Sequence, residues 1–182
     1  MHSDRFFVFT GGPGAGKTTL VEALRAKGFA ATEEAGRGVI REEMQAGGDA
    51  LPSADRERFA ERMFEWELSS YRQARQEAGA VFFDRGLPDT IGYLTLERLP
   101  VPAWMEEEAW RLRYRARVFV APPWKAIYGE DEERRQSWQV AVRTYEVMVH
   151  TYRTFGYELI ELPRAPVGQR IDFVLAQAGL AA

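Results

Sequence analysis

The feature that most constrains this chain is a glycine-rich run, Gly11-Gly-Pro-Gly-Ala-Gly-Lys-Thr18, which matches the pattern G-x-x-x-x-G-K-[ST]. An apolar stretch at residues 5–10 precedes it and has the character of a buried strand, while residues 18–27 have helical spacing. In such a strand–loop–helix unit, the loop N–H groups and the helix N-terminus converge on one point and bind phosphate. The run therefore predicts a nucleotide-phosphate loop on a parallel α/β sheet.

The residue types within this loop predict separate tasks. The Lys17 ammonium reaches the β- and γ-phosphates and is a predicted catalytic group, and the Thr18 hydroxyl is offered to Mg²⁺. The predicted cofactors are accordingly ATP or GTP and Mg²⁺. A dinucleotide fingerprint does not fit, because its third glycine position falls on Lys17. The predicted nucleotide-binding residues are Gly11, Gly12, Pro13, Gly14, Ala15, Gly16, Lys17, Thr18 and Thr19.

Strand-like and helix-like segments alternate along the whole chain, and no linker divides it. This alternation predicts one α/β domain over residues 1–182, with a parallel sheet covered by helices on both faces. Strands are predicted at residues 5–10, 29–33, 80–84, 117–121 and 157–162. Helices are predicted at residues 18–27, 35–45, about 53–77 with Ser53 as N-cap, 89–98, 104–115, 132–155 and 167–178.

Composition excludes several classes of function. The 182 residues carry 24 basic and 27 acidic side chains, a net charge of −3, so a nucleic-acid partner is not expected. There is no cysteine and there are only two histidines, which argues against disulfides and zinc sites. No apolar run approaches the length of a membrane span, so no membrane partner is expected and the predicted location is the cytoplasm.

An acid and a base follow the third predicted strand. Asp84 ends this apolar strand and Arg85 comes next. In a sheet with a phosphate loop, a carboxylate there faces the nucleotide, where it can hold Mg²⁺ or accept a proton from an attacking hydroxyl. Arg85 can grip a phosphate or a substrate. The alternative is an Asp that caps the following turn.

A second charged group follows the second predicted strand. Glu34, Arg37 and Arg41 recur at the spacing of one helix face. Because the carboxyl ends of parallel strands open on one edge of a sheet, Glu34 and Arg37 are predicted to line a substrate site with Asp84 and Arg85. An exposed ion-pair ladder is the alternative.

A third charged segment lies between the fourth strand and the helix after it. We expect a lid over residues 124–136, with Arg134 and Arg135 as catalytic groups that close over the nucleotide. The alternative is a solvated helix start. The alternating arginines Arg111, Arg113, Arg115 and Arg117 are expected to be solvated surface.

Together these residues resemble the small single-domain AAA-type ATPases, which are related to the ribosylnicotinamide kinase domain and to nucleoside and nucleotide kinases. The resemblance rests on GGPGAGKTTL, EEAGRGVIREE, FFDRGLPDTIGYL and YELIELP. It implies a P-loop NTPase fold: a three-layer sandwich around a five-stranded parallel sheet of order 2-3-1-4-5. It also implies a nucleotide site at residues 11–19, an acceptor cleft near Glu34, Arg37, Asp84 and Arg85, and a lid carrying Arg134 and Arg135.

Two functions follow from this reasoning. The first is a P-loop kinase that transfers the γ-phosphoryl group of ATP to a hydroxyl of a small-molecule acceptor, nucleoside-like or another metabolite. The second is an ATP- or GTP-binding switch, or a slow NTPase, without a phosphoacceptor. A polynucleotide end kinase is a third, less favoured reading. The chain contains no asparagine, so the guanine-reading Asn-Lys-x-Asp loop of regulatory GTPases is absent.

Overall fold

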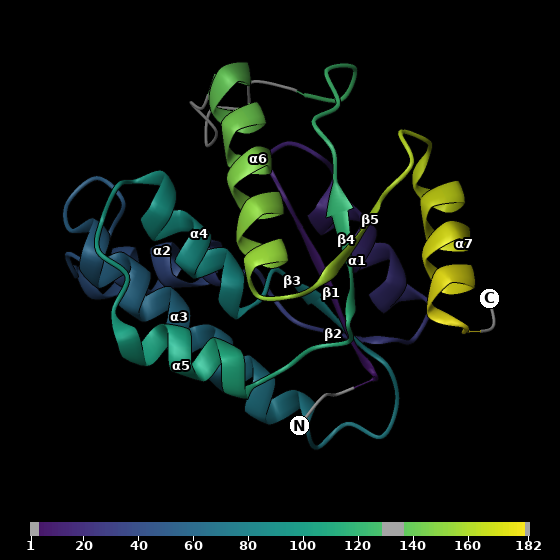
Figure 1. Ribbon diagram of the computed structural model, residues 1–182, viewed down its shortest axis with the longest axis horizontal. Helices are drawn as coiled ribbons and strands as arrows, with labels where there is room; N and C mark the ends of the chain where they lie inside the picture. Colours follow the sequence, from purple (N-terminus) through teal and green to yellow (C-terminus); the bar gives the residue numbers. More distant parts are fainter. Residues whose placement is uncertain (1–3, 129–136, 181–182) are drawn as a thin grey trace.

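Apolar, β-branched and aromatic runs form the strands of a parallel sheet, as the sequence predicts. The computed structural model describes residues 4–128 and 137–180. Within them the sheet has five strands in the order β2-β3-β1-β4-β5 (Figure 1). The predicted fold class and strand order are thus confirmed. The strands are β1 (Phe6–Gly11), β2 (Ala30–Ala31), β3 (Val81–Asp84), β4 (Arg117–Ala121) and β5 (Glu158–Glu161).

Helices connect these strands at the predicted places, with shifted ends. The second strand is only two residues long. The long helix begins at Arg56 rather than at residue 53, because the Asp55 carboxylate accepts a hydrogen bond from the Arg58 N–H and is the N-cap in place of Ser53. The helices are α1 (Lys17–Ala26), α2 (Ala35–Ala46), α3 (Arg56–Ala74), α4 (Leu87–Leu96), α5 (Ala103–Arg111), α6 (Trp138–Thr154) and α7 (Val167–Ala178).

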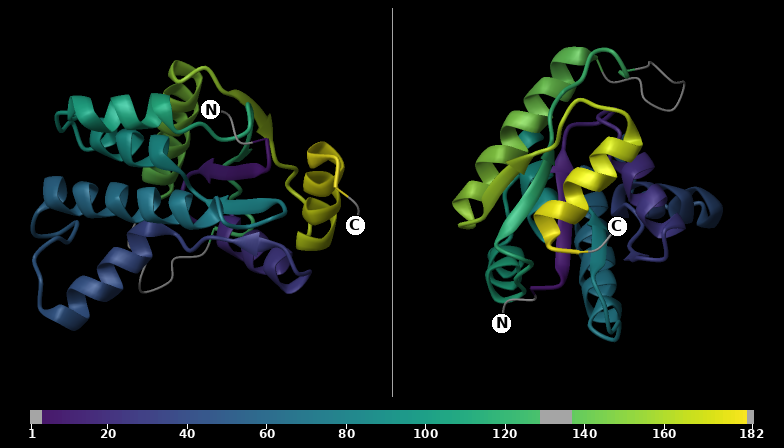
Figure 2. Two further views of the ribbon diagram at one scale, coloured as in Figure 1. Left: turned by 90° about the horizontal axis from the view of Figure 1, so that it is seen from below. Right: turned by 90° about the vertical axis from the view of Figure 1, so that its right-hand side faces the viewer.

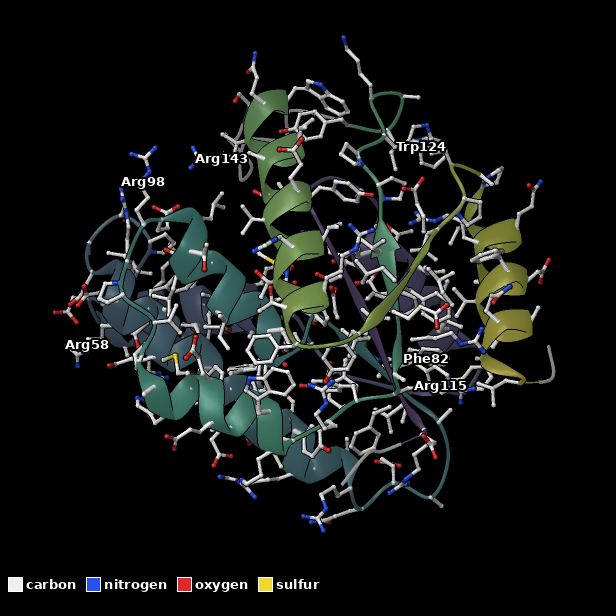
Figure 3. All side chains as sticks on the ribbon, viewed as in Figure 1. Arg58, Phe82, Arg98, Arg115, Trp124 and Arg143 are labelled. Atoms are coloured by element: carbon white, nitrogen blue, oxygen red, sulfur yellow. The ribbon has the colours of Figure 1, made fainter. Side chains whose placement is uncertain are left out.

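The sheet separates two hydrophobic clusters, because successive side chains of a strand point to opposite faces. Phe6 and Val8 of β1 pack toward α2–α6, whereas Phe7 and Phe9 pack toward α1 and α7. The two helical layers lie on opposite sides of the strands in Figures 1 and 2. Phe82 of β3 belongs to the second cluster and lies on the side of the sheet that faces α7 (Figure 3).

One arginine of the alternating run is buried, contrary to expectation. Arg113 donates a hydrogen bond from Nη2 to the Phe155 carbonyl at 2.6 Å, and its guanidinium lies 4.0 Å from the centre of the Tyr157 ring. The run is therefore not uniformly solvated surface. Arg113 instead ties the segment before β4 to the end of α6.

The strand register brings the loop and the predicted acid to one edge of the sheet. Phe9 of β1 lies opposite Asp84 of β3, and Gly11 lies opposite Ala121 of β4. The carboxyl ends of β1, β3 and β4 thus lie at one edge of the sheet, beside the start of α1 (Figure 1). Of the helices that the structure describes, none has both the length and the hydrophobicity of a membrane span.

Candidate functional site

The glycine loop joins β1 to α1 and is held by a buried lysine. Lys17 donates from Nζ to the Gly12 carbonyl at 2.6 Å and to the Gly11 carbonyl at 3.3 Å. Burial, and then the charge of Arg85, lower the pKa of Lys17 to about 8. These bonds place the ammonium over the loop itself, at the position from which it can follow a phosphate.

Thr18, in the first turn of α1, contacts Asp84 at the end of β3. The Thr18 hydroxyl donates to Asp84 Oδ2 at 2.9 Å. The other carboxylate oxygen, Oδ1, is buried and has no hydrogen-bond partner among the described residues. Burial, and then the negative charge of Glu34, raise the pKa of Asp84. A buried carboxylate oxygen without a donor is suited to a cation or to a water bound to one.

This arrangement fits the Mg²⁺ that the phosphate loop implies. Mg²⁺ binds oxygen and keeps several waters, so it needs only one or two protein ligands besides nucleotide phosphates. Thr18 and Asp84 offer one hydroxyl and one free carboxylate oxygen. Within the described part of the chain no group of three metal-ligating acids or histidines forms, so the residues suit a nucleotide-borne ion rather than an all-protein cage.

Arg85 connects Glu34, which follows β2 in the chain, to the glycine loop. It donates from Nε to Glu34 Oε1 at 3.0 Å, and from Nη1 to the Gly11 carbonyl at 3.1 Å and to Asp89 Oδ1 at 3.0 Å. Its backbone is left-handed, with φ of 77°, which costs a non-glycine residue about 1 kcal/mol or more. The strained backbone and the three acceptors hold one guanidinium at the edge of the sheet.

Glu34 is the second carboxylate of this edge. Burial acts to raise its pKa, but the charges of Arg85 and Lys17 outweigh burial, and the pKa of Glu34 is lowered. Arg37 adds an ion pair from Nε to Glu34 Oε2 at 3.1 Å. Glu34 is therefore ionised at neutral pH and can accept a proton or a hydroxyl hydrogen bond.

Asp89, at the start of α4, collects four hydrogen bonds. It accepts at Oδ1 from Thr10 (2.7 Å) and from Arg85, and at Oδ2 from the Gly86 N–H (3.0 Å) and from Tyr152 (2.6 Å). The donors come from β1, the β3–α4 turn and α6. Asp89 is thus the buried anchor that fixes Arg85 and joins three elements behind the site.

Glu67 of α3 is a buried acid beneath the same edge. It is 2% exposed, and its Oε2 has no hydrogen-bond partner among the described residues. Burial, and then the charge of Asp89, raise the pKa of Glu67 well above its usual value. Burial thus disfavours the charged form of Glu67, which has no cationic partner among the described residues.

The structure brings most of the residues predicted for the site together. Lys17, Thr18, Glu34, Asp84 and Arg85 share one edge, and Arg37 reaches it through Glu34. Arg41 does not join them, since its side chain pairs with the exposed Glu33. Arg134 and Arg135 lie outside the described residues, as does most of the expected lid.

The residues that sequence reasoning missed carry weak local signals. Asp89 lies three residues after Gly86 at the start of a helix, the spacing of a capping box, and this pattern was available in the sequence. Glu67 recurs with Phe59, Met63 and Tyr71 on one helix face, and its burial follows from that spacing. Nothing in the sequence near Arg170 of α7 indicates that it contacts the loop.

A separate groove lies beside the edge strand β2. It has a volume of about 530 Å³ and is lined by Thr32, Glu33, Trp66, Ser69 and Gln73, among others. None of its lining residues belongs to the predicted site. The converging charges, rather than this groove, therefore define the candidate active site.

Comparison with known proteins identifies a family for the chain. A family model described as an AAA domain matches residues 6–170. No curated protein sequence is significantly similar to the chain.

Several solved structures are similar to this one. Two are of NadR protein: the complex with NR has a TM-score of 0.72, and the complex with NAD and AMP-PNP has 0.66. Each is 20% identical, and they cover 97% and 98% of this chain but only 52% and 50% of their own, so the chain spans about half of the NadR length. Deoxyadenosine kinase from M. mycoides, with dCMP and dCDP, has a TM-score of 0.60 at 13% identity, covering 96% of this chain and 98% of its own. At these identities the likeness shows the fold alone.

Proposed function

The chain belongs to the AAA domain family, and on that premise we propose that it is a kinase that transfers the γ-phosphoryl group of ATP to a hydroxyl of a small molecule. The observation that carries the proposal is that two carboxylates at this edge have different partners. The buried Asp84 accepts a hydrogen bond from Thr18, at the start of α1. The half-buried Glu34 accepts one from Arg85, whose charge keeps it ionised. A nucleotide switch needs the first carboxylate only.

The proposed roles follow from these contacts. Lys17 and the loop N–H groups bind the phosphates, and Thr18 and Asp84 hold Mg²⁺, which when bound neutralises charge on the phosphates. Glu34 orients the acceptor hydroxyl and takes its proton, and Arg85 fixes Glu34. We still predict that Arg134 and Arg135 contact the transferring phosphoryl group in the transition state. ATP is proposed in preference to GTP, and the lid and the single domain over residues 1–182 remain part of the proposal.

A nucleoside-like acceptor is proposed by analogy, since the similar structures include a complex with NR and one with dCMP. The test is transfer from γ-labelled ATP to a panel of nucleosides, sugars, other hydroxyl compounds and oligonucleotide ends. We expect one class of small hydroxyl compound to become labelled. If no compound is labelled and none changes the rate of ATP hydrolysis, the chain is instead a nucleotide switch or slow NTPase.

Two variants with a matched control separate the roles of the carboxylates. Glu34→Gln should lower transfer by about 100-fold or more with ATP affinity retained, because the proton acceptor is lost. Asp84→Asn should also impair hydrolysis and raise the Mg²⁺ concentration needed. Glu33→Gln is the control, because Glu33 is adjacent but exposed and pairs with Arg41. Equal transfer by Glu34→Gln and Glu33→Gln would contradict the assignment of Glu34.

A further inference from the structure

Arg170, in the first turn of α7, contacts the phosphate loop. It donates from Nη2 to the Ala15 carbonyl at 3.1 Å and from Nη1 to the Gly16 carbonyl at 3.4 Å. The residue is only 4% exposed. A charged side chain from far along the chain is thus buried against the loop backbone.

This guanidinium has no anionic partner among residues 4–128 and 137–180. No carboxylate forms an ion pair with it, and its buried Nε has no hydrogen-bond partner there. Burial alone lowers the pKa of Arg170, with no acid acting to raise it. Buried charges are ordinarily paired, because burying a charge without a partner strongly destabilises the folded protein. Within the described part of the chain the cation therefore has no counter-charge, and a bound anion near the loop would supply one.

The loop backbone is held by cations at both ends. Arg85 binds the Gly11 carbonyl, Lys17 binds the Gly12 carbonyl, and Arg170 binds those of Ala15 and Gly16. When carbonyls of a tight loop point outward to donors, the alternate N–H groups are free to point inward and form an anion-binding nest. Arg170 fixes the half of the loop that leads into α1.

Gly16 is the position that admits Arg170. Its φ is 74°, and a Cβ at this position would lie 2.7 Å from Arg170 Nη1. A side chain at residue 16 would therefore displace the guanidinium from its present position against the loop. The fit between Gly16 and Arg170 joins α7 to the phosphate loop.

We propose that Arg170 is a positioning residue of the nucleotide site: it orients the Ala15–Gly16 backbone and supplies a positive charge that a bound polyphosphate neutralises. The proposal rests on the nucleotide site proposed above and adds a group from outside the G-x-x-x-x-G-K-[ST] pattern. Its ligand is the polyphosphate chain and not the base. Arg170 acts through the loop and does not touch the reacting atoms.

The test measures binding of ATP, inorganic tripolyphosphate and adenosine, each with Mg²⁺, by calorimetry. Arg170→Met should weaken ATP and tripolyphosphate alike, by about 10- to 100-fold, because the loop loses both its orienting contact and a nearby positive charge; this corresponds to about 1.4–2.8 kcal/mol at 1.4 kcal/mol for each factor of ten. Adenosine binding should not change. Arg170→Lys keeps the charge with a single donor group and should fall between wild type and Arg170→Met.

Arg164→Met is the matched control, because Arg164 also contacts a backbone carbonyl, that of Pro123, but is exposed. It should stay within about twofold of wild type in ATP affinity, well under 1.4 kcal/mol. Urea unfolding without ligand checks the fold; in Arg170→Met the loss of two hydrogen bonds to the loop and the removal of a buried charge have opposite effects on stability, and a single cooperative transition is expected. If Arg170→Met is folded and binds tripolyphosphate as wild type does, or loses adenosine as much as ATP, the proposal is wrong. If wild type itself binds no tripolyphosphate or ATP, the phosphate site is wrong and this inference falls with it.

Discussion

At the scale of single residues, the site contains a buried positive charge, the Lys17 ammonium, whose burial disfavours its protonated form. Lys17 is buried, and in the absence of a phosphate its ammonium is satisfied by backbone carbonyls. Burial and Arg85 together hold its pKa at about 8, below the ordinary 10.5. Between these two values the folded protein binds fewer protons than the unfolded chain, so this residue favours folding more as pH rises through that range.

Nucleotide binding should raise the lowered pKa of Lys17, so we predict that Lys17 takes up a proton when the nucleotide binds. A bound polyphosphate stabilises the ammonium, so above about pH 8 binding must first protonate Lys17, and ATP affinity should fall by up to about tenfold per pH unit. Calorimetry at pH 8.5–9 in buffers of different ionisation enthalpy measures the uptake. Lys17→Arg, which stays protonated, is the control and should show none. Wild-type binding without proton uptake would contradict the lowered pKa.

At the scale of elements, the position of Glu34 depends on how α2 lies against α3. Glu34 is the N-cap residue of α2, so a displacement of that helix moves the carboxylate directly. A Cβ at Gly38 of α2 would lie 2.5 Å from the Trp66 indole of α3, whereas a Cβ at Gly36 would have ordinary contacts, the nearest at 3.5 Å. The two glycines therefore form a matched pair in one helix.

Gly38→Ala should lower the free energy of unfolding by about 1–3 kcal/mol through overpacking, and should reduce phosphoryl transfer more than ATP affinity. Gly36→Ala should be neutral or stabilising by up to about 1 kcal/mol, since alanine favours the helix. Urea denaturation and the transfer assay provide both measurements. Equal stability of the two variants would mean that Trp66 moves aside and that this contact does not position α2.

The sequence predicted the elements, and the placement of Thr18 and Asp84 at one edge of the sheet, because both depend on local patterns. The loop motif, the strand ends and the parallel topology together place Thr18 beside Asp84, and the structure has them in contact. The convergence on Asp89 of donors from three elements depends on packing between segments far apart in the chain, which no local pattern encodes. The burial of Arg170 on the loop is of the same kind.

At the scale of the whole molecule, we expect the two core clusters to unfold together, because four successive residues of β1, Phe6–Phe9, contribute alternately to one cluster and to the other. Far-UV circular dichroism and tryptophan fluorescence should give coincident urea transitions. Mg²⁺ and ATP at 100 times the dissociation constant should raise the free energy of unfolding by about 2.7 kcal/mol. Separate transitions, with only one moved by nucleotide, would show two independent units.

The sheet that separates the two clusters also divides the residues of the proposed site into two groups. The α1 and α7 side carries the loop and Arg170, while the α2–α6 side carries Glu34, Asp89 and Glu67. Substitutions in groups that are distant and share no partners combine additively in free energy. Glu34 and Asp89 do not meet this condition, because Arg85 donates to both of them and to the Gly11 carbonyl of the loop. We therefore expect substitutions on the α2–α6 side to leave the nucleotide side unaffected only where they lie away from Arg85, so that divergence of the acceptor site is confined to positions that this one guanidinium does not reach.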